Sequence, residues 1–106
     1  MNALNSILIE GNVIANTEKR ETPRGTTVCD IKIASSRFYR LDGTTEEEKS
    51  IFSIESWAKL AESCAEHCTE GRGVRVVGRL KQCEDGSIKV VAEHVEFKPT
   101  FNKKSS

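Results

Sequence analysis

Hydrophobic residues recur at helical spacing in one stretch of the chain and at alternate positions in several others. In the helical stretch they fall at i, i+3, i+4, i+7, i+8 and i+11, which places them on one face of a helix. These positions are Trp57, Leu60, Ala61, Cys64, Ala65 and Cys68. Gly71 follows where a left-handed residue would end the helix. The pattern predicts one short helix with a single buried face.

Alternation of hydrophobic and polar residues predicts five strands. They cover residues 6–15, 26–36, 51–54, 74–81 and 87–97. Gly11 interrupts the first of them, and a glycine inside a strand is typical of a bulge or a sharp bend. Residues 84–86 (EDG) separate the last two strands and predict a hairpin.

Two polar stretches separate the early strands. Residues 22–25 (TPRG) predict a turn, because proline presets φ and glycine adds flexibility after it. Residues 37–49 contain Asp42-Gly43 and the acidic triplet 46–48, which predict an exposed, mobile loop. At the other end, residues 101–106 (FNKKSS) indicate a frayed polar terminus.

The order of elements is three strands, one helix and two strands, and a chain of 106 residues is long enough for one core. This order predicts the all-β oligonucleotide-binding fold, or OB-fold. That fold is a five-stranded Greek-key barrel with one helix between strands three and four, and its ligands cross strands two and three. We expect one such domain over residues 1–98, followed by a short polar end over 99–106.

Four short motifs carry a resemblance to a known family. They are residues 7–13 (ILIEGNV), 22–26 (TPRGT), 59–62 (KLAE) and 78–80 (GRL). In order and spacing the chain resembles the bacterial single-stranded DNA-binding protein family over about residues 2–97. The resemblance implies binding of single-stranded DNA with little sequence preference, in replication, recombination and repair. It also implies a homo-tetramer, less often a dimer, in the bacterial cytoplasm on the nucleoid.

Sequence-tolerant binding of single strands needs aromatic rings on which bases stack. By the resemblance, Tyr39 and Trp57 occupy ring positions and Phe52 lies next to a third. Ile51 stands where the family usually has a tryptophan, and the last loop contains no aromatic residue. A tryptophan that opens an apolar helical stripe is also typical of a core residue, so both roles stay open for Trp57.

Basic residues supply the second ingredient, contacts to phosphates. They are spread over the predicted strands and loops as Lys32, Arg37, Arg40, Lys59, Arg75, Arg79, Lys81 and Lys89. Outward lysines and arginines are often only solvated, and that alternative remains open here. With the resemblance, the expected nucleic-acid site is Arg37, Tyr39, Arg40, Phe52, Trp57, Lys59, Arg79 and Lys81. We expect Phe38 and Phe97 to pack instead.

Charge and cysteine content narrow the setting. Sixteen basic and sixteen acidic residues cancel, so overall charge neither requires nor excludes nucleic acid. The sequence has no apolar run near the roughly 20 residues that span a bilayer and no signal-peptide pattern at its start, so we expect a cytosolic protein without membrane contact. In that reducing setting the four cysteines are expected to be free thiols.

Two chemical alternatives find less support. Cys64, His67 and Cys68, with His94 or Cys83, are residue types that bind zinc, but Cys64 and Cys68 lie on the predicted buried stripe, where cysteine acts as a small hydrophobe. The sequence contains no nucleophile elbow, phosphate-binding glycine loop or HExxH motif. We therefore expect no metal, no cofactor and no catalysis.

Two functions from different classes remain. The first is non-catalytic coating of single-stranded DNA; the second is an OB-fold protein-interaction or replication-restart accessory module with weak nucleic-acid binding. The first strand is rich in apolar residues on both faces, so we expect symmetric association, with a tetramer favoured over a dimer. The chain ends in KKSS, so the acidic partner-recruiting tail of the family is expected to be absent.

Overall fold

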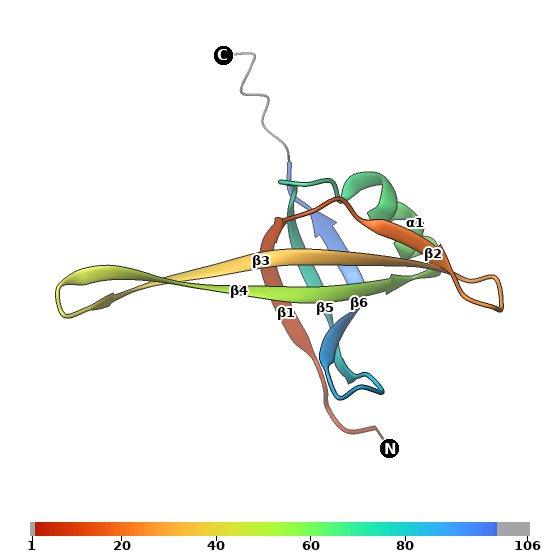
Figure 1. The fold of residues 1–106 in the computed structure, drawn as a ribbon, viewed down its shortest axis with the longest axis horizontal. Coiled ribbons are helices and arrows are strands. Elements are labelled where there is room, and N and C mark those ends of the chain that lie inside the picture. Colours follow the sequence, from red (N-terminus) through yellow and green to blue (C-terminus); the bar gives the residue numbers. More distant parts are fainter. Residues whose placement is uncertain (1, 100–106) are drawn as a thin grey trace, which may run out of the picture.

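The computed structural model describes residues 2–99, which form six strands and one helix (Figure 1). Before the helix lie four strands, and two follow it. In chain order the elements are β1 (Ile7–Val13), β2 (Glu18–Glu21), β3 (Thr27–Leu41), β4 (Thr44–Trp57), α1 (Ala58–His67), β5 (Gly73–Gln82) and β6 (Ile88–Phe97). Apart from residue 99, the predicted polar end 99–106 lies outside the described residues.

Five of the strands close into a barrel. They are hydrogen-bonded in the order β1-β5-β6-β4-β3, and β1 pairs with β3 to complete the ring. The β4–β6 pairing is parallel and the other pairings are antiparallel. The helix lies between the third and fourth barrel strands along the chain. The predicted five-stranded OB-fold barrel with its single helix is therefore confirmed.

Gly11 lies where β1 passes from one neighbour to another. Residues 7–12 of β1 pair with β5, whereas residues 12–13 pair with β3. A Cβ atom at Gly11 would lie 2.3 Å from the carbonyl oxygen of Ala34, far inside van der Waals contact. Only glycine lets the two strands cross this closely, which is the physical reason for the interruption seen in the sequence.

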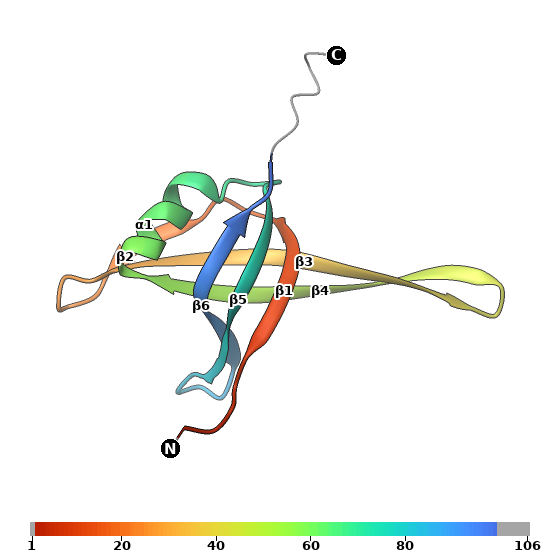
Figure 2. The same ribbon diagram turned by 180° about the vertical axis from the view of Figure 1, so that it is seen from behind.

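The prediction of a mobile loop over residues 37–49 was wrong. β3 and β4 remain paired without a break from Val28 opposite Trp57 to Leu41 opposite Thr44. The hairpin turns at Asp42 and Gly43, whose φ angles of 50° and 82° suit the tight turns that join twisted strands. Residues 36–49 form an arm that extends beyond the barrel, and we call it the β3–β4 arm (Figures 1 and 2).

Strand β2 was not predicted. Its four residues are charged and exposed, so they show no hydrophobic alternation. They form a strand because they pair with residues 27–30 of β3, on the edge that β1 leaves free. The predicted turn at residues 22–25 is present after β2, where the amide of Gly25 donates to the carbonyl of Thr22 at 2.8 Å.

The helix is shorter than predicted and ends earlier. It ends at His67 with Cys68 as its C-cap, so Gly71 does not terminate it. Gly71 instead has φ 91° in the following loop, where its amide donates to the carbonyl of Val13. Trp57 precedes the helix and is 38 % exposed, so it does not belong to the buried stripe. The stripe begins one turn later and covers one end of the barrel.

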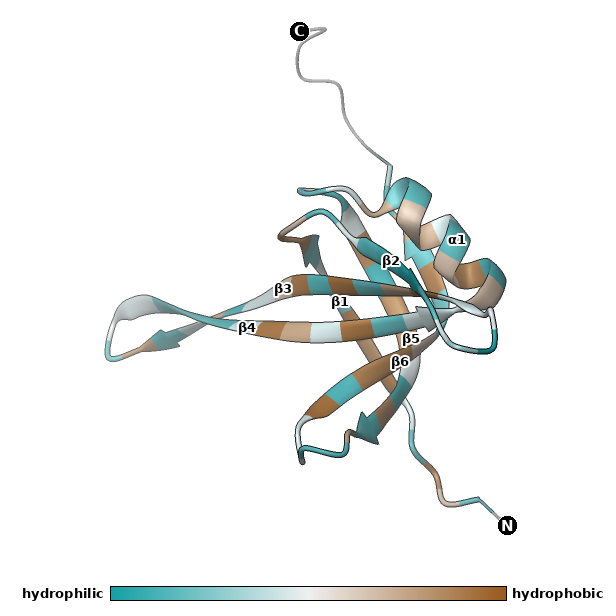
Figure 3. Cartoon of the chain, turned by 45° about the vertical axis from the view of Figure 1, so that its right-hand side comes forward, coloured by the Kyte–Doolittle hydropathy of each residue, from teal (hydrophilic) through white to brown (hydrophobic). Residues whose placement is uncertain are grey.

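The core fills the barrel and the space beneath α1. Its large members come from every barrel strand, and Cys29, Cys64 and Cys68 complete it beside Ala61. Figure 3 shows hydrophobic bands where the strands cross in the barrel, whereas most of the β3–β4 arm is pale or hydrophilic. All four cysteines have free thiols, three buried and Cys83 half-buried. Within residues 2–99 the only helix is too short to cross a membrane.

Candidate nucleic-acid interface

Strands β3 and β4 present one face to the core and the other outward. The inward pairs are Cys29–Ser56, Ile31–Ile54 and Ile33–Phe52. The outward pairs are Asp30–Glu55, Lys32–Ser53 and Ala34–Ile51. Because side chains alternate across a strand, the outward row can carry polar groups without disturbing the core. These strands are the second and third of the barrel, where OB-folds bind their ligands.

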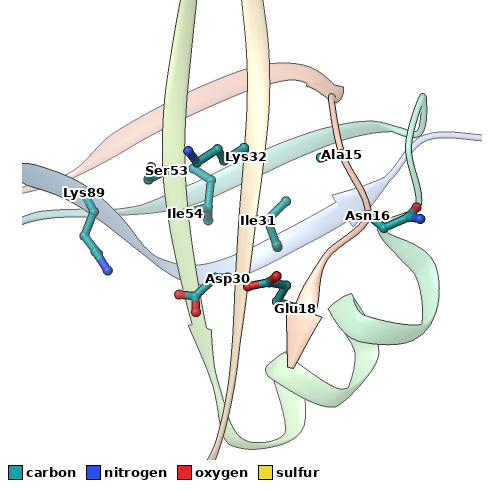
Figure 4. Close-up of a pocket in the computed structure, with 9 residues that line it drawn as sticks. All are labelled: Ala15, Asn16, Glu18, Asp30, Ile31, Lys32, Ser53, Ile54 and Lys89. Carbon is teal, nitrogen blue, oxygen red and sulfur yellow. The ribbon is translucent and has the colours of Figure 1, made fainter. Parts of the chain in front are cut away.

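A hollow of about 480 Å³ crosses this part of the molecule. Figure 4 shows Lys89 of β6 at one end and Asn16 of the β1–β2 connection at the other, with Ile31 and Ile54 between them. Lys32 and Ser53, an outward pair, also line it. The hollow therefore runs across β3 and β4 between flanking segments, as expected for a ligand path in this fold.

Three basic side chains surround one buried carboxylate, that of Glu55, beside the hollow. The side chain of Glu55 is only 5 % exposed, although it points outward from β4. Its oxygens lie 3.4 Å from Arg20 Nη2, 3.4 Å from Lys81 Nζ and 3.5 Å from Lys89 Nζ. We call Arg20, Glu55, Trp57, Lys81 and Lys89 the Glu55 cluster. The cluster adjoins the hollow through Lys89, which belongs to the cluster and also lines the hollow.

Hydrogen bonding fixes the ring of Trp57 in this cluster. The indole Nε1–H donates to Glu55 Oε1 at 2.9 Å. The residue remains 38 % exposed, so part of its ring surface faces solvent. Trp57 lies directly before α1 and opposite Val28 of β3. The structure thus places it at the outward surface and not in the core, which leaves it available for stacking.

Glu55 is ionised at neutral pH. Burial raises the pKa of its carboxyl, but the hydrogen bond from Trp57 and the charges of Lys81 and Lys89 outweigh burial and bring the pKa below its ordinary value of 4.5. Arg20 also binds Asp30, with Nε 2.6 Å from Oδ2. Three cations thus surround two carboxylates, which leaves one net positive charge beside the hollow.

Three other predicted site residues lie outside this cluster. Lys59 is exposed in the first turn of α1. Arg79 shares the exposed side of β5 with Lys81, two residues away, and lies 3.7 Å from Glu93. Phe52 is different: it is half-buried, points inward opposite Ile33 and packs against the core.

The remaining predicted residues lie on the β3–β4 arm. Arg37 and Tyr39 share one face, with the guanidinium carbon of Arg37 5.4 Å from the centre of the Tyr39 ring. Arg40 lies on the other face, where it donates to the carbonyl of Gly43 at 3.1 Å. Phe38 shares that second face and is 66 % exposed, so the prediction that it packs was wrong. Phe97, in contrast, packs against the core as predicted.

The zinc alternative finds no arrangement to support it among residues 2–99. No three histidine, cysteine, aspartate or glutamate side chains in this part of the chain come together in a way that could hold a metal ion. Cys64 and Cys68 are buried in the core beneath α1. Burial of both thiols beside each other is explained by packing, since unpaired cysteine behaves as a small apolar residue.

The sequence of this chain is similar to those of known proteins. The model of the single-strand binding protein family matches residues 4–98. The chain belongs to that family. Among curated members, the single-stranded DNA-binding protein of Corynebacterium glutamicum is 38% identical over 80 residues, which cover 73% of this chain and 36% of the relative. The single-stranded DNA-binding protein of Clostridium tetani is 30% identical over 97% of this chain and 76% of its own length.

Solved structures of the family agree with the fold. A deletion mutant of the single-stranded DNA binding protein from Thermus aquaticus superposes with a TM-score of 0.80 at 25% sequence identity, over 91% of this chain and 51% of that one. This single-strand binding family chain spans about a third to a half of the length of the first curated relatives that it matches. The likeness therefore concerns the barrel domain.

Sequence reasoning missed Glu55 and Arg20. The predicted third strand stopped at Ile54, because a glutamate offers no apolar continuation, and Arg20 lay in the unpredicted strand β2. Lys89 was recognised as basic but not selected. A sequence signal for Glu55 existed: a lone acidic residue between Ile54 and Ser56, two positions before a tryptophan, at the end of a strand expected to cross the ligand.

Proposed function

We propose that this chain binds single-stranded DNA without catalysis and with little sequence preference. One observation carries the proposal: a partly exposed tryptophan ring and three cations are held together beside the hollow that crosses β3 and β4. Rings for bases and cations for phosphates are the two elements of sequence-tolerant single-strand binding. The relatives named single-stranded DNA-binding proteins support the same activity.

The site residues follow from this placement. Trp57 is the stacking ring, and Lys81, Arg79 and Lys59 contact phosphates on or near the barrel. Arg37, Tyr39 and Arg40 contribute from the arm where the strand reaches it, while Phe52 supports the binding strands from inside. The cellular role that fits is protection of exposed DNA in replication, recombination and repair, in the bacterial cytoplasm on the nucleoid.

Trp57 is the chain's single tryptophan, so intrinsic fluorescence reports on the site directly. Titration with oligo-thymidine should quench the emission of Trp57 as a base stacks on its ring. A control titration with a duplex of equal length should give a weaker response at the same salt concentration. Unchanged emission together with no oligo-thymidine binding by fluorescence anisotropy would reject the proposal.

We also propose that copies of the chain associate symmetrically, as a tetramer or a dimer. Leu8 on β1 is 65 % exposed, Leu80 on the neighbouring strand β5 is 44 % exposed, and Ile51 on β4 is 50 % exposed. Apolar surface of this kind is typical of subunit contacts. Light scattering at tens of micromolar should give a mass above that of the 11.8 kDa chain. A monomer at that concentration would refute the association.

A second function, a protein-interaction module with weak nucleic-acid binding, keeps one observation in its favour. The β3–β4 arm carries Asp42 and the acidic triplet Glu46–Glu48 against only three basic residues. An acidic arm repels phosphates and attracts basic protein surfaces. The oligo-thymidine titration separates the two functions, because the interaction module would bind the oligonucleotide weakly or not at all.

A further inference from the structure

Glu55 occupies an unusual position for a carboxylate. It lies on the outward face of β4 and yet its side chain is 95 % buried, under side chains that come from β2, β4, β5 and β6. A buried charge is stable only when it is paired and hydrogen-bonded. Glu55 meets this condition through the indole of Trp57 and the cations of Arg20, Lys81 and Lys89.

These partners keep part of their binding capacity free. A lysine ammonium has three donors, and the side chain of Lys81 is still 42 % exposed while it contacts Glu55. Its remaining donors can reach a phosphate on the solvent side without leaving the carboxylate. The indole has a single donor, which Glu55 accepts, so Trp57 offers a ligand only its ring faces. Arg20 lies closer to Asp30, at 2.6 Å, than to Glu55, at 3.4 Å, so it links the two carboxylates.

We propose that Glu55 is the positioning residue of a subsite for one nucleotide. In this subsite a base stacks on the ring of Trp57, and Lys81 and Lys89 bind the adjoining phosphate. The inference rests on the proposed function, because it describes how the same interface holds one unit of the strand. Glu55 contacts neither base nor phosphate; it fixes the ring edge and the two ammonium groups in place before the strand arrives.

Glu55 could instead oppose DNA binding, because a carboxylate near the strand repels its phosphates. The two effects differ in sign. Under repulsion, loss of the Glu55 charge tightens DNA binding, as loss of any nearby acidic charge would. Under positioning, loss of this charge weakens binding, because the ring and the lysines lose their common anchor.

The test compares oligo-thymidine affinity at fixed salt for the full chain and three variants. Glu55→Gln keeps the length and an acceptor for the indole but removes the charge; Glu55→Asp keeps the charge but shortens the reach. Glu96→Gln removes an equal charge from β6, where Glu96 pairs with the exposed Arg75 of β5, and serves as the matched control. We expect both Glu55 variants to weaken binding by about threefold or more, typical of coupled neighbours, and the control to bind as tightly as wild type or more tightly.

Coupling to Lys81 distinguishes positioning from a general loss of structure. Lys81→Gln should weaken binding in the wild-type background and should weaken it less in the Glu55→Gln background. Melting curves establish whether each variant is folded at the assay temperature. If Glu55→Gln does not fold, Glu55→Asp replaces it as the background for the Lys81 comparison.

Each outcome is distinguishable. If the wild-type chain binds oligo-thymidine and both folded Glu55 variants bind it as tightly or more tightly, this inference is overturned and the proposed function stays intact. Additive effects of the Lys81 and Glu55 substitutions also overturn it. A wild-type chain that does not bind oligo-thymidine overturns both.

Discussion

The barrel surface and the β3–β4 arm hold their positive charges in different ways. In the Glu55 cluster three cations from three strands converge on a carboxylate that is 5 % exposed. On the arm, Arg37 lies 3.9 Å from Glu48, and both side chains are more than 60 % exposed. Exposed pairs of this kind contribute only about 0–1 kcal/mol and restrict their side chains little. The barrel thus holds three cations against one buried charge, whereas the arm pairs Arg37 with an exposed one.

The net charge of the two regions differs as well. The cluster and Asp30 leave one positive charge in excess, whereas the arm has four acidic residues against three basic ones. A single strand carries one negative charge per nucleotide, so both differences favour the barrel as its principal path. Each prediction below tests this contrast between the two regions, and the largest expected effect comes first.

Replacement of the ring in each region should give the largest difference. Trp57→Ala should weaken oligo-thymidine binding by roughly 1–3 kcal/mol, about 5- to 150-fold, because a stacked base is lost. Tyr39→Ala, the matched change on the arm, should cost less. Affinity by fluorescence anisotropy and the melting temperature are measured on both variants. Unchanged affinity of Trp57→Ala with a large loss of stability would show that the ring supports the fold instead.

Removal of one cation from each region should change the salt dependence unequally. For single strands each phosphate contact adds about −0.7 to the slope of log K against log salt concentration. Lys81→Gln should make the slope shallower by about that amount, whereas Arg37→Gln, on the arm, should make it shallower by less. Titrations at four or more salt concentrations give both slopes. An equal change for Arg37→Gln would place the arm on the path of the strand.

Acid should destabilise the Glu55 cluster and not the arm. The pKa of Glu55 is lowered in the folded chain, by Trp57, Lys81 and Lys89 against the effect of burial; Arg20 and Asp30 also face this carboxyl group. A lowered folded pKa adds stability that is fully present above the ordinary value of 4.5 and is lost as the pH falls through the folded value. Wild type should therefore lose more melting temperature between pH 6 and pH 3 than Glu55→Gln, whereas Glu48→Gln should follow wild type.

The two regions also differ in how far the sequence predicts them. The barrel strands and the helix face were predictable, because burial of one face imposes alternation or helical spacing on residues such as Ile31, Ile33 and Cys64. The arm buries neither face, so residues 37–49 carry no such pattern and were taken for a loop. Strand β2 was missed for the same reason, since its four residues are all charged and exposed.

The candidate site was predictable only in part. Trp57 and Lys81 were found through residue type and the resemblance to the family, and the structure brings them together through a residue that neither criterion selects. Glu55 is buried because side chains from four strands cover it, and three of those strands are distant in sequence. Burial of an outward polar residue depends on tertiary contacts, which no local pattern records.

The smallest effect is expected from the acidic triplet of the arm. Replacement of Glu46, Glu47 and Glu48 by glutamine changes the arm from one net negative charge to two net positive charges. At physiological salt, charges further than about 8 Å from the strand are largely screened, so a strand bound along the barrel should gain less than about threefold in affinity. Stability should change by no more than about 0.5 kcal/mol per site, as is usual for exposed positions.

The salt slope is the sensitive measurement for this triple replacement. A strand that passes over the arm would contact Arg40 and Arg37, which has then lost its pair with Glu48, and the slope would steepen by about 0.7 for each phosphate they bind. An unchanged slope would show that the barrel alone sets the path of the strand.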